Sequence, residues 1–281
     1  MKTIYLTNDN LDQWQRKARP NVIALGCFDG LHIGHQKVIH TAWQKANELN
    51  LSLSVMSFFP HPKIILLGDK HRFHYLMPQS EKEEKLKSLG VDTFYQLKFD
   101  HTFASLSPEQ FVHNYLIKLG VVHAVAGFDF SYGSRGAGNM KRLHDDSNGL
   151  IQVTKVEKVE FAGEKISSSL IREKLHEGNV EELSNLLGHS YEVKCDWGGS
   201  SLIPHPYYTL PAQGNYYVSI KNEFGSIGTV VEVFDDNGVQ SLRCEGLSPL
   251  KKGKCSVIWH HHLPKEKRKL RPLVSFVPYS Y

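Results

Sequence analysis

The chain has 281 residues, of which 41% are hydrophobic and 22% charged, and its formal net charge at pH 7 is +4. This composition is that of a globular protein of about two domains, and it excludes intrinsic disorder, collagen-like repeats and low complexity for the chain as a whole. The positive excess is too small to indicate nucleic-acid binding, and it fits ligands that carry phosphate.

The first two thirds of the chain alternates strand-like and helix-like segments. In chain order we predict a strand at 21–26, a helix at 34–50, a strand at 51–59, a helix at 80–89, a strand at 94–97, a helix at 108–119, strands at 121–127 and 150–156, and helices at 167–175 and 180–187. The strands are mostly continuous apolar runs, as in sheets that are buried on both faces. The pattern predicts an α/β fold, a Rossmann-like doubly wound parallel sheet.

The last third of the chain has a different character. From residue 191 onward we predict short strands at 216–221, 227–234, 240–244, 256–260 and 273–277, with Asp236-Asn237-Gly238 as a hairpin turn. We interpret the basic run at 265–269 as a solvated turn between strands. The chain is therefore divided into an α/β domain at 1–188 and a small all-β, barrel-like domain at 189–281.

The strongest motif directly follows the first predicted strand and opens a helix. A tight glycine turn there meets a helix N-terminus, where backbone N–H groups and the helix dipole favour anions such as phosphate. Two histidines three residues apart share one side of the first helical turn and can donate to phosphate oxygens as charge develops. The motif contains Gly26, Phe28, Asp29, Gly30, His32, Gly34 and His35.

A second basic segment precedes and opens the helix predicted at 167–175. Serines before Leu170 can cap this helix, and Arg172 is expected in its first turn. Lys165 adds a cation just upstream. Together with Ser168 and Ser169, these residues predict a second anion site that suits a triphosphate.

Four motifs, in order, resemble the bacterial FAD synthetase family of the HxGH nucleotidylyltransferase superfamily. The turn resembles its Gly-x-Phe-Asp-Gly-x-His-x-Gly-His. The other three are Phe58-Phe59-Pro60-His61-Pro62, Gly127-Phe128-Asp129-Phe130-Ser131-Tyr132-Gly133 and Ile166-Ser167-Ser168-Ser169-Leu170-Ile171-Arg172. The resemblance covers roughly residues 20–188.

The resemblance implies an FMN adenylyltransferase, a transferase with ATP and FMN as substrates and Mg²⁺ as cofactor. It implies catalytic roles for His32, His35 and Arg172. Nucleotide or flavin binding is expected of the turn residues, Gly26, Phe28, Asp29, Gly30 and Gly34, and of Pro60, His61, Asp129, Lys165, Ser168 and Ser169. The side chains that would hold the metal are left open. A related transferase with another phosphate acceptor is a further alternative.

The β-rich region resembles a reduced riboflavin kinase domain. Bifunctional members of the family carry a Pro-Thr-Ala-Asn motif in that domain, and this chain has none. We therefore expect no riboflavin kinase activity. Three alternatives stay open: a bifunctional enzyme, an unrelated β-domain, and a non-catalytic regulator that binds flavin or nucleotide.

The compartment is predicted from the cysteines and from the lack of long apolar runs. No run of 18 apolar residues is present, so we expect no membrane span. Cys27, Cys195, Cys244 and Cys255 form no CxxC pair, and scattered thiols suit a reducing compartment. We expect a cytoplasmic protein with small-molecule partners, and the sequence does not predict its oligomeric state.

Overall fold

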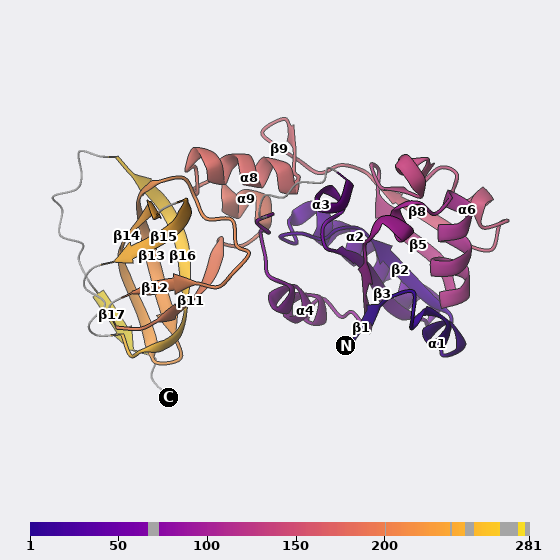
Figure 1. Cartoon of the computed structure of the whole chain (residues 1–281), viewed down its shortest axis with the longest axis horizontal. Coiled ribbons are helices and arrows are strands. Elements are labelled where there is room, and N and C mark those ends of the chain that lie inside the picture. Colours follow the sequence, from indigo (N-terminus) through magenta and orange to yellow (C-terminus); the bar gives the residue numbers. More distant parts are fainter. Residues whose placement is uncertain (67–72, 200, 237, 245–249, 265–274, 279–281) are drawn as a thin grey trace. The chain divides into compact units, whose positions relative to one another are not determined.

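The computed structural model describes residues 1–66, 73–199, 201–236, 238–244, 250–264 and 275–278 (Figure 1). The predicted basic turn at 265–269 lies outside these residues, as do Asn237 and the first two residues of the strand predicted at 273–277. The chain divides into two compact units. One consists of Met1–Phe73 and Gln79–Glu160, and the other of His74–Pro78 and Phe161–Tyr281.

This division by contacts differs from the boundary predicted between residues 188 and 189. The prediction followed the loss of helical periodicity, whereas the contacts group two further helices, α8 (Ser168–Glu177) and α9 (Leu183–Leu187), with the strands that follow them. Periodicity and compactness are separate criteria, so the predicted boundary stays a prediction.

The first unit is built on a six-stranded sheet in the order β1-β4-β3-β2-β5-β8. Every neighbouring pair in it is parallel, which confirms the predicted doubly wound fold. The strands are β1 (Lys2–Leu6), β2 (Asn21–Leu25), β3 (Ser52–Phe59), β4 (Thr93–Lys98), β5 (Val121–Gly127) and β8 (Gln152–Val156). All five residues of β2 are buried, as the continuous apolar run predicted.

Helices cover both faces of this sheet. Successive side chains of a strand point to opposite faces, so each face has its own set of side chains for helices to cover. On one face, Ile23 and Leu25 belong to a core cluster with aromatic and aliphatic side chains from residues 103–119. On the other lies α2 (Ile33–Leu49), beside the central strands of the sheet (Figure 1). It packs against β2, β3 and β5 through a buried stripe. That stripe consists of Val38, Ile39, Ala42 and Ala46.

The helix predicted at 108–119 changes type along its length. It begins as α6 (Pro108–Phe111), with Ser107 in a capping box, continues as the π-helical turn η1 (Val112–Leu116) and ends as the 3₁₀ turn η2 (Ile117–Leu119). The remaining helical segments of this unit are α1 (Leu11–Arg16), α3 (Pro62–Leu66), α4 (Gln79–Ser88), α5 (His101–Ala104), η3 (Ser134–Gly136) and α7 (Leu143–Asp146). No helix among the described residues is long and apolar enough to cross a membrane.

The second unit contains a closed antiparallel barrel, which confirms the predicted all-β region. Its strands follow the order β13-β16-β11-β12-β15-β14, and pairing between β13 and β14 closes the ring, with β17 added to β14. Burial alternates along β13 and β14, as expected for strands with one face toward a core. The strands are β11 (Glu192–Trp197), β12 (Leu202–Pro204), β13 (Gly214–Asn222), β14 (Gly225–Asp236), β15 (Val239–Cys244), β16 (Gly253–Leu263) and β17 (Ser275–Pro278).

Two short hairpins complete the described elements. In the first unit β6 (Ser131–Tyr132) pairs with β7 (Gly138–Asn139) directly after the end of β5. Just before α8, β9 (Glu160–Phe161) pairs with β10 (Glu164–Lys165). The loop of the first hairpin contains Gly133 and Gly136.

Candidate active site

The turn between β2 and α2 has an unusual backbone. Gly30 has a φ of 81°, and two residues with side chains, Phe28 and Leu31, have φ of 48° and 45°. A Cβ on Gly26 would lie 3.0 Å from the ring of Phe28, so a side chain there would crowd the ring. Left-handed φ at residues other than glycine is costly and concentrates at functional sites, where the surrounding structure holds it in place.

His32 caps helix α2 with its own ring. The backbone N–H of His35 donates to Nδ1 of His32 at 3.3 Å. Because Nδ1 accepts this hydrogen bond, the neutral ring carries its proton on Nε2 and can donate from there. The rings of His32 and His35 stack with centroids 3.6 Å apart. The first turn of α2 contains no acidic residue, so no carboxylate there opposes an anion.

The sheet order places three predicted segments at the same end of the sheet, where the carboxyl ends of the strands lie. β3, β2 and β5 are adjacent and parallel, so the residues that follow them lie at the same end of the sheet. Pro60 and His61 follow β3, and Asp129 follows β5 on an exposed turn. The chain leaves β2 toward β3 on one side and β5 lies on its other side, so this is the switch point where open α/β sheets bind ligands.

The ring of His61, at the carboxyl end of β3, is held in a defined position. Its Nδ1 accepts a hydrogen bond from the backbone N–H of Lys63 at 3.2 Å, and its ring stacks on Phe73 with centroids 4.6 Å apart. This leaves the neutral His61 with its proton on Nε2, as in His32.

The other predicted site residues belong to the second unit. Lys165 ends β10, and Ser168, Ser169 and Arg172 lie on α8. The helix is capped by Ser167, whose hydroxyl accepts from the N–H of Leu170 at 3.2 Å. Arg172 is the fifth residue of α8 and therefore lies in its second turn, not the first turn that we predicted.

Within the second unit the structure brings Arg172 to Ser168. The guanidinium donates to the carbonyl of Ser168 at 3.2 Å and to the carbonyl of His74 at 3.3 Å. These contacts hold the side chain along the start of α8. Its joint action with the histidine pair of the first unit stays a prediction.

Two side chains that the sequence analysis did not single out contact the turn. The hydroxyl of Ser57, on β3, donates to the carbonyl of Cys27 at 2.7 Å, and Nζ of Lys82, on α4, donates to the same carbonyl at 3.1 Å. A signal was present in the sequence: Lys82, Leu86 and Leu89 follow helical spacing, which places a lysine in line with two apolar residues.

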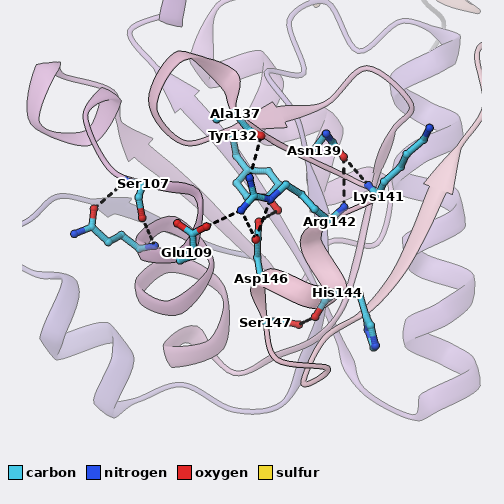
Figure 2. A network of polar contacts seen from close by, with 11 residues as sticks. Ser107, Glu109, Tyr132, Ala137, Asn139, Lys141, Arg142, His144, Asp146 and Ser147 are labelled. Carbon is cyan, nitrogen blue, oxygen red and sulfur yellow. Dashed lines mark hydrogen bonds and ion pairs between the residues drawn. The ribbon is translucent and has the colours of Figure 1, made fainter.

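A network of charged and polar side chains holds the hairpin that follows Asp129 (Figure 2). The hydroxyl of Tyr132 donates to Asp146 at 2.6 Å, and the guanidinium of Arg142 donates to Asp146 at 2.7 Å and to Glu109 at 2.6 Å. Burial, and then the hydrogen bond to Asp146, raise the pKa of Tyr132, which therefore remains a protonated donor. The network links β6, through Tyr132, to α7 and α6.

Comparison with known proteins gives a consistent result. A family model described as FAD synthetase matches residues 14–170. A bifunctional riboflavin kinase/FMN adenylyltransferase of Bacillus subtilis is 47% identical over 194 residues, which is 69% of this chain and 61% of that protein. An FAD synthetase of Listeria monocytogenes is 32% identical over 230 residues, 81% of this chain and 92% of that protein.

The fold of both units also occurs in a solved structure. A structure described as a macrolide-efflux protein from Streptococcus pneumoniae aligns with a TM-score of 0.81 and 28% identity, and the match covers 94% of this chain and 91% of that one. The match to the bifunctional relative extends over only about three fifths of that relative's length.

Proposed function

The chain belongs to the FAD synthetase family, and from that premise we propose that it is an FMN adenylyltransferase. It would transfer the AMP group of ATP to FMN and release FAD and pyrophosphate. The observation that carries the proposal is the His32–His35 pair at the start of α2, at the switch point of a parallel sheet. A cytoplasmic location is part of the same proposal.

The reaction needs alignment and charge neutralisation, and no covalent nucleophile from the protein. An oxygen of the FMN phosphate attacks the α-phosphorus of ATP, a new P–O bond forms, and the bond to the β-phosphate oxygen breaks. His32 would donate from Nε2 to the reacting phosphate, together with His35 and the N–H groups at the start of α2. Preorganised donors of this kind stabilise charge as it develops in the transition state.

The remaining predicted residues have binding roles in the proposal. Lys165, Ser168, Ser169 and Arg172 would hold the triphosphate and the leaving pyrophosphate. Gly26, Phe28, Asp29, Gly30 and Gly34 would shape the nucleotide site, because they make the turn from which α2 starts. Pro60, His61 and Asp129 would border the flavin at the ends of β3 and β5.

Mg²⁺ fits this site as a companion of the nucleotide. Among the residues that the structure describes there is no group of three His, Cys, Asp or Glu side chains that could hold a metal ion. Mg²⁺ in nucleotide sites is usually bound by one or two carboxylates together with substrate phosphates. Asp29 and Asp129 are the carboxylates of the motifs near the turn, and the ion would neutralise charge on the phosphates.

The barrel is proposed to lack riboflavin kinase activity. The chain contains no Pro-Thr-Ala-Asn sequence. The Listeria protein that matches over 92% of its length is named an FAD synthetase only, which is consistent with a transferase of this size without the second activity.

One experiment tests both parts of the proposal. The protein is incubated with ATP and Mg²⁺ and either FMN or riboflavin, and the flavins are separated by chromatography. We expect FAD from FMN and no FMN from riboflavin. Absence of FAD with both oxidised and reduced FMN would refute the transferase, and FMN formed from riboflavin would establish a bifunctional enzyme.

A further inference from the structure

Lys82 is a buried lysine on an otherwise solvated helix. Only 3% of its surface is exposed, and on α4 it shares the buried face with Leu86 alone. The other charged residues of the helix are half-buried or exposed. A buried ammonium group is costly unless other groups compensate for the lost water. The groups around Lys82 therefore indicate which interactions compensate for its burial.

These groups belong to the turn between β2 and α2. Nζ of Lys82 lies 3.1 Å from the carbonyl oxygen of Cys27, to which it donates, and 3.5 Å from the hydroxyl of Ser57, which donates to the same oxygen. Asp29, with 1% of its surface exposed, is close enough for its charge to act on Lys82. Burial lowers the pKa of Lys82, and the charges of Asp29 and Cys27 oppose this shift.

The position of the Cys27 carbonyl affects the backbone conformation of the turn. It belongs to the peptide unit that leads into Phe28, the first of the two residues with side chains and left-handed φ. Two donors from two different elements, β3 and α4, converge on this one oxygen. With the carbonyl fixed, the peptide plane is fixed as well, and with it the path of the chain toward His32 and the start of α2.

We propose that Lys82 is a positioning residue for the turn at Gly26–Gly34. It holds the Cys27 carbonyl and so keeps the turn in the conformation from which the histidine pair would act. It acts through the backbone and touches no substrate. The inference rests on the proposed function only for its kinetic consequences, because the anchoring itself is measurable without substrate.

A simple packing role would make a different prediction. Methionine has nearly the length of lysine and fills buried space well. If Lys82 served only to fill the core, Lys82→Met would leave the turn unchanged. If it anchors the turn, the same variant removes one of the two hydrogen bonds to the Cys27 carbonyl, and the backbone of the turn leaves its folded conformation more often.

The experiment compares Lys82→Met with Lys87→Met, which changes an exposed lysine on the same helix. Amide hydrogen exchange of peptides covering residues 26–34 is measured on the full chain without ligands. Hydrogen bonds from charged donors are strong enough that we expect exchange there to be about tenfold faster in Lys82→Met. Lys87→Met should match the wild type.

Kinetics then separate positioning from general damage. With FMN and ATP, kcat of Lys82→Met should fall about tenfold or more, because small displacements of catalytic groups are costly. KM for FMN should change much less than kcat. Unchanged exchange at residues 26–34 would overturn the proposal, and so would unchanged kcat in an active enzyme. If the wild type itself made no FAD, the proposed function would fail, and exchange would still decide the role of Lys82.

Ser57→Ala covers the case in which Lys82→Met does not fold. It removes only the hydroxyl that shares the Cys27 carbonyl, and it leaves the lysine in place. We expect faster exchange in the same segment at residues 26–34 and unchanged exchange in α2 beyond its first turn. Exchange as slow as in the wild type would show that this carbonyl does not control the turn.

Discussion

The two ring nitrogens of His32 can have separate roles. Nδ1 accepts the hydrogen bond that caps α2, and Nε2 is the nitrogen that can donate to a phosphate. The cap thus selects the Nε2–H tautomer, the form that the proposed role of His32 requires.

Substitution of His32 can separate these two roles. Asparagine is among the best N-cap residues, so His32→Asn should retain the stability of the wild type, whereas His32→Ala should lose about 1 kcal/mol. Both should lower kcat by about 10²–10³, because both lose the donor to the phosphate. Chemical denaturation and FAD formation measure the two effects. Wild-type turnover in His32→Asn would remove the histidine from the mechanism.

Lys82 should leave a signature in the pH dependence of stability. Its pKa is lower in the folded protein than the ordinary value of 10.5, mainly because it is buried. Between these two values the unfolded chain binds more protons, so the free energy of unfolding of the wild type rises with pH. Relative to Lys82→Met, the wild type should therefore gain stability as the pH approaches about 10.5. Parallel curves for the two proteins would contradict this, and Lys87→Met should give a curve parallel to that of the wild type.

At the scale of elements, predictability followed the strength of the local pattern. The β2–α2 unit was predicted within one or two residues, because a fully buried strand and a regular apolar stripe both leave clear sequence patterns. Strands β1, β11 and β12 were missed, since they are short and partly exposed. The helix at 108–119 was predicted in extent but not in type, because helical periodicity does not reveal a π-helical turn.

For the site too, local sequence patterns predicted only what local sequence determines. The turn and its histidines were predicted from local sequence, whereas Ser57 and Lys82 reach Cys27 from positions 30 and 55 residues away. Such contacts depend on strand order and on the packing of α4. A charged residue is normally assigned to the surface, and the helical spacing of Lys82 with Leu86 and Leu89 does not by itself outweigh that expectation.

The hairpin after β5 offers a test of the network in Figure 2. Tyr132→Phe removes the hydrogen bond to Asp146 in a buried position, and we expect a loss of about 1.5–3 kcal/mol, as for bonds to charged groups. Tyr5→Phe removes a similar bond to Glu83 at an exposed tyrosine and should change stability by less than about 0.5 kcal/mol. Equal effects, measured by denaturant unfolding, would show that burial does not strengthen the contact at Tyr132.

At the scale of the whole molecule, the residues predicted for the site belong to both units. The histidine pair belongs to the first unit, and Lys165, Ser168, Ser169 and Arg172 belong to the second. If the proposed roles are correct, neither unit alone binds the nucleotide as the full chain does. The predicted boundary at 188 and the compact units differ because residues 161–188 group by contacts with the barrel.

Arg172→Ala tests this dependence. Loss of a guanidinium that binds phosphate should raise KM for ATP about tenfold and leave KM for FMN nearly unchanged. Lys174→Ala is the matched control on the same helix, because that lysine pairs with Glu182. Equal loss for both substrates would contradict the placement of Arg172 on the triphosphate.

The second unit includes five residues, His74–Pro78, from a much earlier part of the chain. Tyr75 exchanges backbone hydrogen bonds with Tyr207 and Thr209, and the hydroxyl of Thr209 also binds the carbonyl of Tyr75 across 134 positions. During synthesis at about 5–20 residues per second, residues 74–78 therefore emerge roughly 7–27 s before the residues that they pair with. On the ribosome this segment of the second unit therefore stays without these backbone partners until residues 207–209 have been synthesised.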